Sequence, residues 1–478
     1  MARTKIVCTI GPASKSKKTI QDLIKSGLNV ARLNFSHGTH ADHKSLLTNI
    51  RSMADKMNRT VAILQDLQGP RIRIGDIGSK ERELKDNEKV IITTSKVTKD
   101  SKKIPITYDR LHSEVEKGHR ILIVDGLIQL VVDQVTGRDI HASVVIGGII
   151  ASHKGVNLPD TAVSIPSLTD KDKKDVEFGV ENDVDYMALS FVRSAKDVYD
   201  LKYLIKSYEK KLKKKITNPI KIVVKVERKE AIDNLEEIIE ATDAVMVARG
   251  DLGIELPAED VPLMQKMIID HCLEKAKPVI VATQMLDSMI HNPRPTRAEV
   301  SDVANAVIDH TDALMLSGET ATGSYPIQTV SYMKRIIEKT EASAYDDLAP
   351  QLYSKKIEPT NEAIGRIANI LATSVDAKLI LVASISGYAG RIISRYRPEL
   401  PILVACDNNR VKQQLILSWG VVPFIIPTCR TVEELIDRSI SHLKKEKLIF
   451  KSDKIIIIAG EPVGSSGNVN LVEIKEIN

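Results

Sequence analysis

The sequence predicts an α/β protein built on a (β/α)8 TIM barrel, with an inserted antiparallel β-barrel lid domain and a C-terminal α/β domain. Three observations support this fold. Eight short runs of β-forming residues each end in a polar or glycine-rich segment, and helical patterns lie between most of them. Residues 71–160, after the third run, alternate with period two instead. The 478 residues are enough for roughly two to four structural units.

The strands of the barrel are predicted from apolar runs that switch abruptly to polar residues. In chain order they are residues 5–11, 29–37, 61–70, 185–191, 222–227, 244–251, 278–284 and 313–320. Strands that alternate with helices imply a parallel sheet. The segment Thr242-Asp243-Ala244 before the sixth run recurs as Thr311-Asp312-Ala313 before the eighth. Similar residues at equivalent positions favour a repeated unit.

Helix signals separate these runs. Ile20, Leu23 and Ile24 form an apolar stripe that Gly27 closes. After the seventh run, the segment 296–299 reads Thr-Arg-Ala-Glu, which is a capping box at the start of a helix. Its position predicts a helix that follows the seventh strand.

The eight runs extend over residues 5–320, which is more than the about 250 residues that eight barrel units need. An insertion after the third run accounts for the excess. Within it, Asp125-Gly126 interrupts an alternating pattern and predicts a hairpin. We therefore expect a barrel domain at 1–70 and 161–341 and a β lid domain at 71–160. The insertion is either a lid that closes over the barrel mouth or a passive decoration.

Beyond the barrel, the sequence returns to alternating strands and helices. Apolar runs at 379–384, 401–407, 421–426 and 454–460 are separated by helical stretches and followed by one more strand-like run. We expect a C-terminal α/β domain at 342–478. This part adds no recognisable catalytic group of its own.

Composition excludes several classes of protein. Apolar residues make up 43% and charged residues 27%, and no apolar run is long enough to span a bilayer. The net charge of +5 and the 4% of aromatic residues do not indicate binding to nucleic acid. The four cysteines have no paired spacing. The first residues run into a strand without a secretory signal, so we expect a cytoplasmic protein.

Two acidic residues at neighbouring strand ends predict a metal site. Lys225 and Glu227 end the fifth run, and Gly250 and Asp251 end the sixth. Because the carboxyl ends of barrel strands meet at one mouth, these side chains should converge. Two carboxylates together with substrate oxygens suit a hard cation such as Mg²⁺, and Lys225 would face an anion that the metal holds. The other interpretation is that Lys225 and Glu227 form a salt bridge at the barrel rim.

Other polar residues follow the strands toward the same mouth: Arg32, Asn34, Ser36 and His37 after the second, Asp66, Gln68 and Arg71 after the third, and Thr283 after the seventh. Together they predict a site for a small substrate with several negative charges. Individually they have simpler explanations, since Arg32 could hold a loop carbonyl and His37 could be solvated. The chain has no P-loop or Rossmann glycine motif, so any phosphoryl chemistry must rely on metal and cations.

Many ordered segments resemble the pyruvate kinase family over essentially the whole chain. They are KIVCTIGPAS at 5–14, ARLNFSHG at 31–38, KGVNLP at 154–159, KVE at 225–227, VARGDLG at 247–253, ATQML at 282–286, NPRPTRAEVSDVANAV and LSGETATGSYP. The resemblance implies a barrel, a β lid after the third strand and a regulatory C-terminal α/β domain. It also implies transfer of a phosphoryl group from phosphoenolpyruvate to ADP, which gives pyruvate and ATP in glycolysis.

The resemblance implies roles for individual residues. Glu227 and Asp251 would bind Mg²⁺ or Mn²⁺, and Lys225 and Arg32 would contact the phosphoryl group. Gly250, Asp251 and Thr283 would also contact the substrate, with Thr283 near the enolate carbon. Contacts to the nucleotide phosphates are implied for Asn34, His37, Arg73 and Lys154. The family is usually a homotetramer.

One segment departs from the family pattern. Members that need a monovalent cation usually read Asp-Thr-Lys-Gly-Pro-Glu after the third strand, whereas this chain reads Asp-Leu-Gln-Gly-Pro-Arg at 66–71. Arg71 therefore stands where those members have an acidic residue, and we expect its guanidinium to replace K⁺. The alternative is that Arg71 points to solvent and K⁺ binds through Asn34, Ser36 and the Asp66-Leu67 segment.

Allosteric control and two rival functions remain open on the sequence. The loop with Ser384, Ser386 and Gly387 stands where many family members bind the phosphate of an activator, but the basic residue often found there is absent. A metal-dependent lyase acting on related metabolites would need neither the lid nor Lys225. A regulator that binds a phosphorylated metabolite would work through the C-terminal domain.

Overall fold

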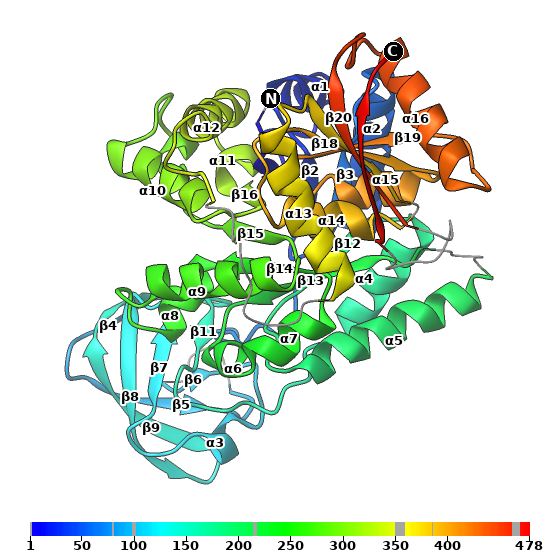
Figure 1. The fold of residues 1–478 in the computed structure, drawn as a ribbon. Helices are drawn as coiled ribbons and strands as arrows, with labels where there is room; N and C mark the ends of the chain where they lie inside the picture. The colour runs from blue at the N-terminus through cyan, green and yellow to red at the C-terminus, as the bar shows by residue number, and fades with distance from the viewer. Residues whose placement is uncertain are drawn as a thin grey trace.

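The structure is a computed structural model that describes residues 2–78, 81–97, 102–213, 218–348, 359–384, 386–460 and 469–478. Eight parallel strands form a closed barrel in the middle of the molecule (Figure 1). They are β1 (Lys5–Thr9), β2 (Val30–Asn34), β3 (Ala62–Asp66), β12 (Tyr186–Leu189), β13 (Lys221–Val226), β14 (Ala244–Ala248), β15 (Val279–Ala282) and β16 (Ala313–Leu316). Each predicted run coincides with one of these strands, so the predicted barrel is confirmed.

The barrel closes because β1 pairs with both β2 and β16. Lys5 lies opposite Ala313, and Val7 lies opposite Val30. Between these ends the strand order runs β16, β15, β14, β13, β12, β3 and β2. Side chains on both faces of the strands are buried, as expected when helices cover a parallel barrel.

Helices surround the barrel and carry the start signals seen in the sequence. They are α1 (Lys17–Ser26), α2 (His40–Lys56), α4 (Asp170–Glu181), α5 (Ala195–Lys211), α6 (Lys229–Asp233), α7 (Leu235–Ala241), α8 (Arg249–Glu255), α9 (Val261–Glu274), η1 (Asp287–Ile290), α10 (Arg297–Ile308), α11 (Gly318–Ala321) and α12 (Pro326–Thr340). The capping box at the start of α10 is confirmed: Thr296 accepts from the Glu299 amide, and the Glu299 carboxylate accepts from the Thr296 amide. Gly27 ends α1 with φ 128°, a conformation that favours glycine.

The repeated Thr-Asp segment has a common structural role. The Thr242 and Thr311 hydroxyls each donate to two backbone carbonyls at the starts of neighbouring strands. Asp243 accepts from the Ile222 amide, and Asp312 accepts in the same way from the Val279 amide. The equivalence predicted from the sequence is therefore confirmed, and it lies at the amino-terminal end of the barrel.

The inserted β domain lies at the opposite end of the barrel from the C-terminal domain (Figure 1). Its elements are β4 (Arg82–Leu84), β5 (Lys89–Thr93), β6 (Ile104–Pro105), α3 (Leu111–Glu114), β7 (Arg120–Ile123), β8 (Ile128–Thr136), β9 (Asp139–Ile146), β10 (Gly148–Ile150) and β11 (Val156–Asn157). Six strands form one sheet, in which β5 and β6 are parallel and the other pairs antiparallel. The predicted turn at Asp125-Gly126 connects β7 to β8, and both residues have positive φ, as a tight hairpin requires.

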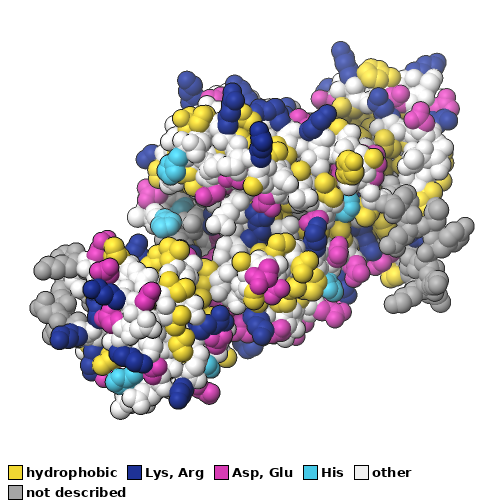
Figure 2. All heavy atoms as spheres, turned by 90° about the vertical axis from the view of Figure 1, so that its left-hand side faces the viewer, with side chains coloured by type: hydrophobic (Ala, Val, Ile, Leu, Met, Phe, Trp, Pro, Cys, Tyr) yellow, Lys and Arg dark blue, Asp and Glu magenta, His cyan; other side chains and the backbone are white. Residues whose placement is uncertain are grey.

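In the described part of the C-terminal domain, five strands form one sheet, in which four are parallel and one is antiparallel. Its elements are α13 (Thr360–Ser374), β17 (Leu379–Ala383), α14 (Tyr388–Ser394), β18 (Ile402–Cys406), α15 (Asn409–Leu415), β19 (Val421–Ile425), α16 (Val432–Lys445), β20 (Lys454–Ala459) and β21 (Leu471–Glu476). All strands predicted here are confirmed. In Figure 2, basic and acidic side chains are interspersed over the face that is shown. Across the described ranges, no helix is both long and apolar enough to cross a membrane.

Asp312 joins the barrel to the C-terminal domain. Its carboxylate accepts from the Trp419 amide at 2.9 Å and forms an ion pair with Arg397 at 2.9 Å. Both charged residues are only 4% exposed. Removal of one partner would leave the other charge buried and uncompensated.

We therefore predict that Asp312→Asn lowers the free energy of unfolding by about 3 to 5 kcal/mol. Urea titrations followed by circular dichroism would measure this loss. The matched control is Asp170→Asn, because Asp170 pairs with Lys173 on the surface and is 92% exposed. Equal unfolding midpoints for the two variants would contradict the role of Asp312.

Candidate active site

The candidate residues converge because their strands end at one mouth of the barrel. β2, β3, β13, β14 and β15 bring Arg32, Asp66, Lys225, Asp251 and Thr283 to the end that faces the inserted domain. A groove of about 1170 Å³ opens at the edge of this mouth, next to Asp251 and Thr283, and extends along α9 and α10. Asp125, from the turn of the inserted domain, lines the groove together with Asp251 and Thr283.

Lys225 is the centre of a buried polar cluster. Its ammonium lies 2.6 Å from the Glu227 carboxylate, 3.7 Å from Asp66, and donates to the Ser190 hydroxyl at 2.9 Å. The other oxygen of Glu227 accepts from the Phe191 amide at 2.7 Å. Lys225 is 9% exposed and Glu227 is 1% exposed. The predicted proximity of Lys225 and Glu227 is therefore observed, but deeper than at an exposed rim.

The electrostatics of the cluster keep Lys225 charged. Burial lowers the pKa of Lys225, but the Asp66, Glu227 and Asp251 carboxylates outweigh it, so its pKa lies above the ordinary value. Burial raises the pKa of Glu227, and Asp251 adds to this, while Lys225 opposes it. A further cation near Glu227 would therefore be favourable.

Arg32 neutralises the other acidic residue of the cluster. Its guanidinium donates to the Asp66 carboxylate at 2.7 Å and to the Thr9 hydroxyl at 2.8 Å. Burial raises the pKa of Asp66, whereas the Lys225 and Arg32 charges lower it. The two cations outweigh burial, so the pKa of Asp66 lies below its ordinary value. Arg32 therefore contacts two side chains in this structure. Both cations of the cluster face Asp66.

Asp251 and Thr283 are positioned together. Gly250, in the first turn of α8, donates its amide to the Thr283 hydroxyl at 2.8 Å. Thr283 has φ 71°, which is unusual for a β-branched residue. Arg249 donates to the Thr283 carbonyl at 2.8 Å and forms an ion pair with Asp302 at 2.8 Å. This strained backbone is thus held by a fixed guanidinium, a pattern that is common at functional sites.

The side chains fit a divalent cation with few protein ligands. Each Glu227 oxygen has one close partner, the Lys225 ammonium at 2.6 Å or the Phe191 amide at 2.7 Å, so each keeps a lone pair for a metal, and Asp251 acts on Glu227 electrostatically. Among the residues that the structure describes, no group of three or more His, Cys, Asp or Glu side chains has the geometry of a metal cage. Two carboxylates completed by substrate oxygens and water are the usual arrangement for Mg²⁺.

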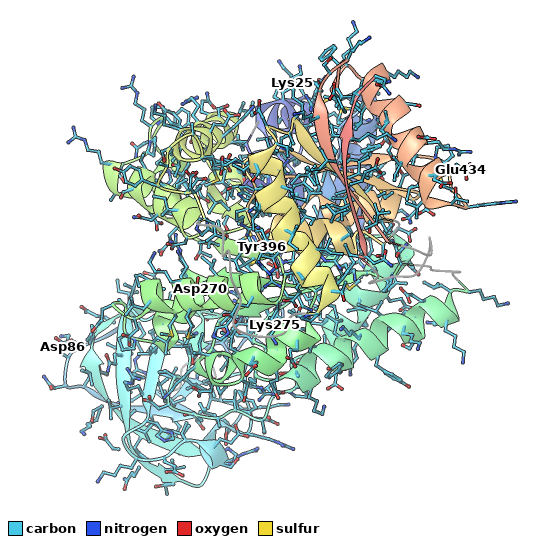
Figure 3. The ribbon with its side chains drawn as sticks, in the orientation of Figure 1. Lys25, Asp86, Asp270, Lys275, Tyr396 and Glu434 are labelled. Carbon is cyan, nitrogen blue, oxygen red and sulfur yellow. The ribbon has the colours of Figure 1, made fainter. Side chains whose placement is uncertain are left out.

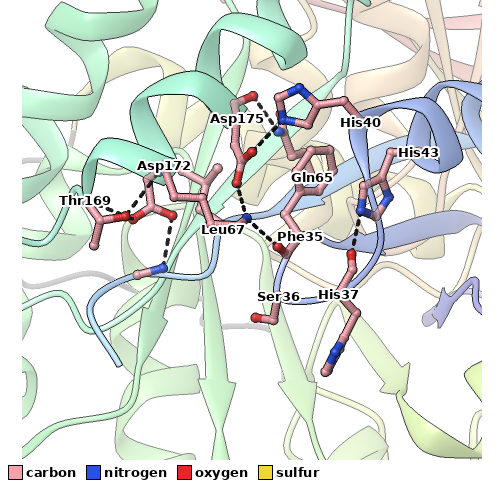
Figure 4. A network of polar contacts seen from close by, with 12 residues as sticks. Phe35, Ser36, His37, His40, His43, Gln65, Leu67, Thr169, Asp172 and Asp175 are labelled. Carbon is pink, nitrogen blue, oxygen red and sulfur yellow. Dashed lines mark hydrogen bonds and ion pairs between the residues drawn. The ribbon is translucent and has the colours of Figure 1, made fainter. Parts of the chain in front are cut away.

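The loop after β2 is held in place by a lysine of α4. Lys171 donates to the Phe35 carbonyl at 2.6 Å and pairs with Asp175 at 2.6 Å. Asp175 also contacts His40, at the start of α2 (Figure 4). This clamp lies beside the loop residues Asn34, Ser36 and His37, of which His37 is exposed and Asn34 accepts from the Ser36 amide.

The segment predicted to replace K⁺ lies next to this loop. The Leu67 carbonyl, a candidate ligand for a cation, already accepts from the Ser190 hydroxyl at 2.8 Å. Arg71 is exposed, lines the groove and contributes to the lowered pKa of Asp66. Its charge therefore acts on the region where K⁺ would bind, while its side chain remains accessible to a ligand.

Arg73 and Lys154 lie side by side at the base of the inserted domain. Arg73 forms an antiparallel bridge with Gly155 and donates to the His153 carbonyl at 2.9 Å. The Ile74 amide donates to the Lys154 carbonyl at 2.9 Å. Two basic residues therefore lie on adjacent backbone segments of the inserted domain.

The predicted effector loop is not part of this site, because it lies between β17 and α14 in the C-terminal domain. Gly387 has φ 72°, and a Cβ there would meet Leu415 at 2.8 Å. The Ser386 hydroxyl accepts from the Tyr388 amide at 3.4 Å, and the Gly387 amide donates to the Ser384 carbonyl. Residue 385 lies outside the described residues.

Several residues that shape the site were not singled out from the sequence. Ser190 links Lys225 to Leu67, Arg249 holds Thr283, and Lys171 holds the loop after β2. Ser190 directly follows β12, so the strand-end rule that found Lys225 applies to it as well. Lys171 had no such signal, because it lies on a helix 136 positions away from Phe35.

Glu255, at the end of α8, makes stability near this site depend on pH. Burial raises its pKa to about 7, with Asp251 adding to the rise and Arg228 opposing it. The folded protein therefore retains a proton that the unfolded chain loses near the ordinary value of 4.5. This stabilisation is complete below the ordinary pKa and is lost as the pH rises through about 7.

The unfolding free energy of the original chain should fall between about pH 5 and pH 8, because Glu255 loses its proton in that range. We predict that this fall is smaller in Glu255→Gln, by at most about 3 kcal/mol. Urea unfolding at the two pH values would measure the difference. Glu259→Gln, which changes an exposed carboxyl nearby, is the control. A fall that is as steep in Glu255→Gln as in the original chain would contradict the shifted pKa.

Comparison with known proteins places this geometry in a family. Residues 1–330 match the family model "Pyruvate kinase, barrel domain", and residues 362–475 match "Pyruvate kinase, alpha/beta domain". Pyruvate kinase of Geobacillus stearothermophilus is 43% identical over 100% of this chain and 80% of its own length. Pyruvate kinase of Clostridium acetobutylicum is 39% identical, and the match covers 100% of both chains.

A solved structure supports the same assignment. A pyruvate kinase from Cryptosporidium parvum superimposes with a TM-score of 0.92 at 37% sequence identity, covering 100% of this chain and 96% of that one. The agreement extends over the barrel, the inserted domain and the C-terminal domain. This chain therefore belongs to the pyruvate kinase family of phosphotransferases.

Proposed function

We propose that this enzyme transfers the phosphoryl group of phosphoenolpyruvate to ADP, giving pyruvate and ATP in glycolysis, with Mg²⁺ or Mn²⁺ and without a requirement for K⁺. The observation that carries the proposal is the buried Lys225 ammonium, held at the barrel mouth by Glu227 and Ser190. A fixed cation beside two metal-binding carboxylates suits a substrate with several negative charges. A lyase acting on related metabolites would not need this lysine.

Phosphoryl transfer needs positioning and charge neutralisation more than covalent help from the protein. The bond from phosphorus to the enolate oxygen breaks, and a bond to the terminal oxygen of ADP forms. Lys225 and Arg32 stabilise the negative charge of the moving group. The metal, held by Glu227 and Asp251, would supply further positive charge when bound. Thr283, whose hydroxyl accepts from the Gly250 amide of α8, would lie near the enolate carbon when that carbon is protonated.

The nucleotide would bind under the inserted domain. Arg73 and Lys154 lie on adjacent backbone segments of that domain and would contact the nucleotide phosphates, together with Asn34 and His37 from the loop after β2. Closure of this domain would exclude water during transfer, because an exposed site would lose the phosphoryl group to hydrolysis. This favours a lid over a passive decoration.

We predict that Lys225→Met lowers pyruvate formation at least about 10³-fold, since one fixed charge on a transferring group contributes that order of stabilisation. A coupled assay with phosphoenolpyruvate, ADP and Mg²⁺ measures the loss. Fold and Mn²⁺ binding should persist. Lys221→Met is the control, because Lys221 lies on the same strand and pairs with Asp243 at the opposite end of the barrel. Full activity in Lys225→Met would exclude the proposal.

Independence of K⁺ is proposed from Arg71. In the original chain, activity in buffer free of both K⁺ and Na⁺ should equal activity with added KCl. Arg71→Glu should lower activity without K⁺ by about tenfold or more and restore it with KCl, because an acidic residue would recreate the need for a cation. Lys56→Glu, an equal charge reversal on the exposed end of α2, should change neither value. Steep activation of the original chain by KCl would refute this part.

Assembly, regulation and location are proposed from the family resemblance. We propose a cytoplasmic homotetramer under allosteric control. The loop with Ser384, Ser386 and Gly387 offers hydroxyl and amide groups to an effector phosphate. No partner other than small metabolites is proposed, and neither nucleic acid nor membrane is.

A further inference from the structure

The first turns of α4 hold both of the loops that follow β2 and β3 (Figure 4). Gly69, in the loop after β3, donates its amide to the Asp172 carboxylate at 3.1 Å. Asp172 also accepts from the Thr169 amide at 2.9 Å, so one carboxylate both caps the helix and holds the loop. In the loop after β2, the Phe35 carbonyl accepts from Lys171 at 2.6 Å. The start of this helix therefore fixes how the two loops lie relative to each other.

Lys171 is itself held by Asp175 and His40. Its ammonium lies 2.6 Å from the Asp175 carboxylate, whose other oxygen contacts the His40 ring at 2.7 Å. Asp175 is 2% exposed, and its backbone carbonyl accepts from the Gln65 side chain of β3 at 2.7 Å. A lysine side chain in water samples many rotamers, and a fixed carboxylate beside it limits this freedom. Lys171 is therefore fixed against the loop after β2.

The Phe35 ring holds the same loop from inside the protein. The ring is 2% exposed and stacks on His43 with 3.9 Å between centroids and 10° between planes. His43 also contacts the His37 carbonyl at 2.9 Å, so the loop is tied to α2 as well. Among the described residues, the Phe35 carbonyl has no hydrogen-bond donor besides Lys171. The orientation of this carbonyl therefore depends on the lysine.

One peptide group connects Lys171 to Asn34. The carbonyl of the Phe35–Ser36 peptide accepts from Lys171, and the amide of the same peptide donates to the Asn34 Oδ1 at 3.1 Å. Because a peptide group is planar, its carbonyl and amide turn together. A turn away from Lys171 would also break the bond to Asn34. With Oδ1 used as an acceptor, the Asn34 Nδ2 group remains a donor, and it has no acceptor within the described ranges of the chain.

We propose that Lys171 is a positioning residue for nucleotide binding, which acts through the Phe35–Ser36 peptide to aim the Asn34 Nδ2 group at a phosphate oxygen of ADP. This inference rests on the proposed function, in which Asn34 contacts the nucleotide. Asn34 follows Arg32 by two positions on β2, so both side chains lie on the inner face of the barrel, at its mouth. An N–H donor binds a phosphate oxygen, whereas an Asn34 side chain turned to present Oδ1 would repel it.

The test is Lys171→Met in the full-length protein, because methionine keeps most of the aliphatic stem and removes the ammonium. Calorimetric titration with ADP and Mg²⁺ should show binding about tenfold weaker, since a hydrogen bond to a charged group contributes about this much. In the coupled assay, KM for ADP should rise similarly, while kcat and KM for phosphoenolpyruvate change less than about twofold. Poorer folding alone would lower kcat and leave both KM values unchanged. Lys171→Arg, which can donate to both partners, should recover most of the ADP affinity.

A double variant separates action through Asn34 from direct contact with the nucleotide. In the Asn34→Ala background, Lys171→Met should weaken ADP binding by less than about twofold more, because its effect requires the Asn34 side chain. A further loss of about tenfold in that background would mean that the lysine contacts phosphate itself, and it would overturn the proposal.

Lys275→Met is the matched control. Lys275 pairs with Glu240 at 2.9 Å and its side chain is 39% exposed, compared with 47% for Lys171. It lies between α9 and β15, at the amino-terminal end of the barrel strands (Figure 3). This variant should change neither KM nor ADP affinity.

Three results would refute the positioning role: no ADP binding to the original chain, unchanged ADP affinity in Lys171→Met, or an equal loss in Lys275→Met. The proposed reaction is tested separately by pyruvate formation. A chain that makes no pyruvate but binds ADP with the expected dependence on Lys171 would refute the reaction and support the positioning role.

Discussion

Closure of the parallel barrel between β1 and β16 is the constraint on which the rest of the structure depends. Because all eight strands run in the same direction, their carboxyl ends share one mouth and their amino ends share the other. Residues that are far apart in sequence, such as Arg32 and Lys225, therefore become neighbours of Asp66. The same closure places the candidate active site at one end and attachment of the C-terminal domain at the other. At that second end, Asp312 has the role of a structural anchor.

The balance of buried charge explains the arrangement at the mouth. Asp66 lies between Arg32 and Lys225, so its negative charge is compensated by two cations. Glu227 is paired only with Lys225, a cation that it shares with Asp66. Its pKa is raised because this one cation does not fully offset the cost of burying the carboxylate. This imbalance favours a metal at Glu227 and Asp251 rather than at Asp66. Near Asp66, Arg71 adds one more positive charge, in the place where family members that require K⁺ carry an acidic residue.

The strand-end rule identified residues that the structure brings together at one mouth, because the rule depends on local sequence. An apolar run followed at once by Lys225 and Glu227, or by Gly250 and Asp251, is visible without a structure. The rule did not identify Lys171 or Arg249, whose partners lie on other segments of the chain. Contacts between distant segments depend on how helices pack against strands, and no local pattern encodes them.

The sequence by itself determined the order of strands and helices, the place of the insertion and the types of residue at each strand end, because hydrophobic periodicity and capping act over a few neighbouring residues. Only the tertiary structure decided which of these residues meet. It buried Lys225 against Glu227, left Arg71 exposed beside the groove, and set Lys171 against the loop after β2. The physical reason is that burial and Coulomb interactions depend on distance in space, which is set by the closure of the barrel and the docking of its domains.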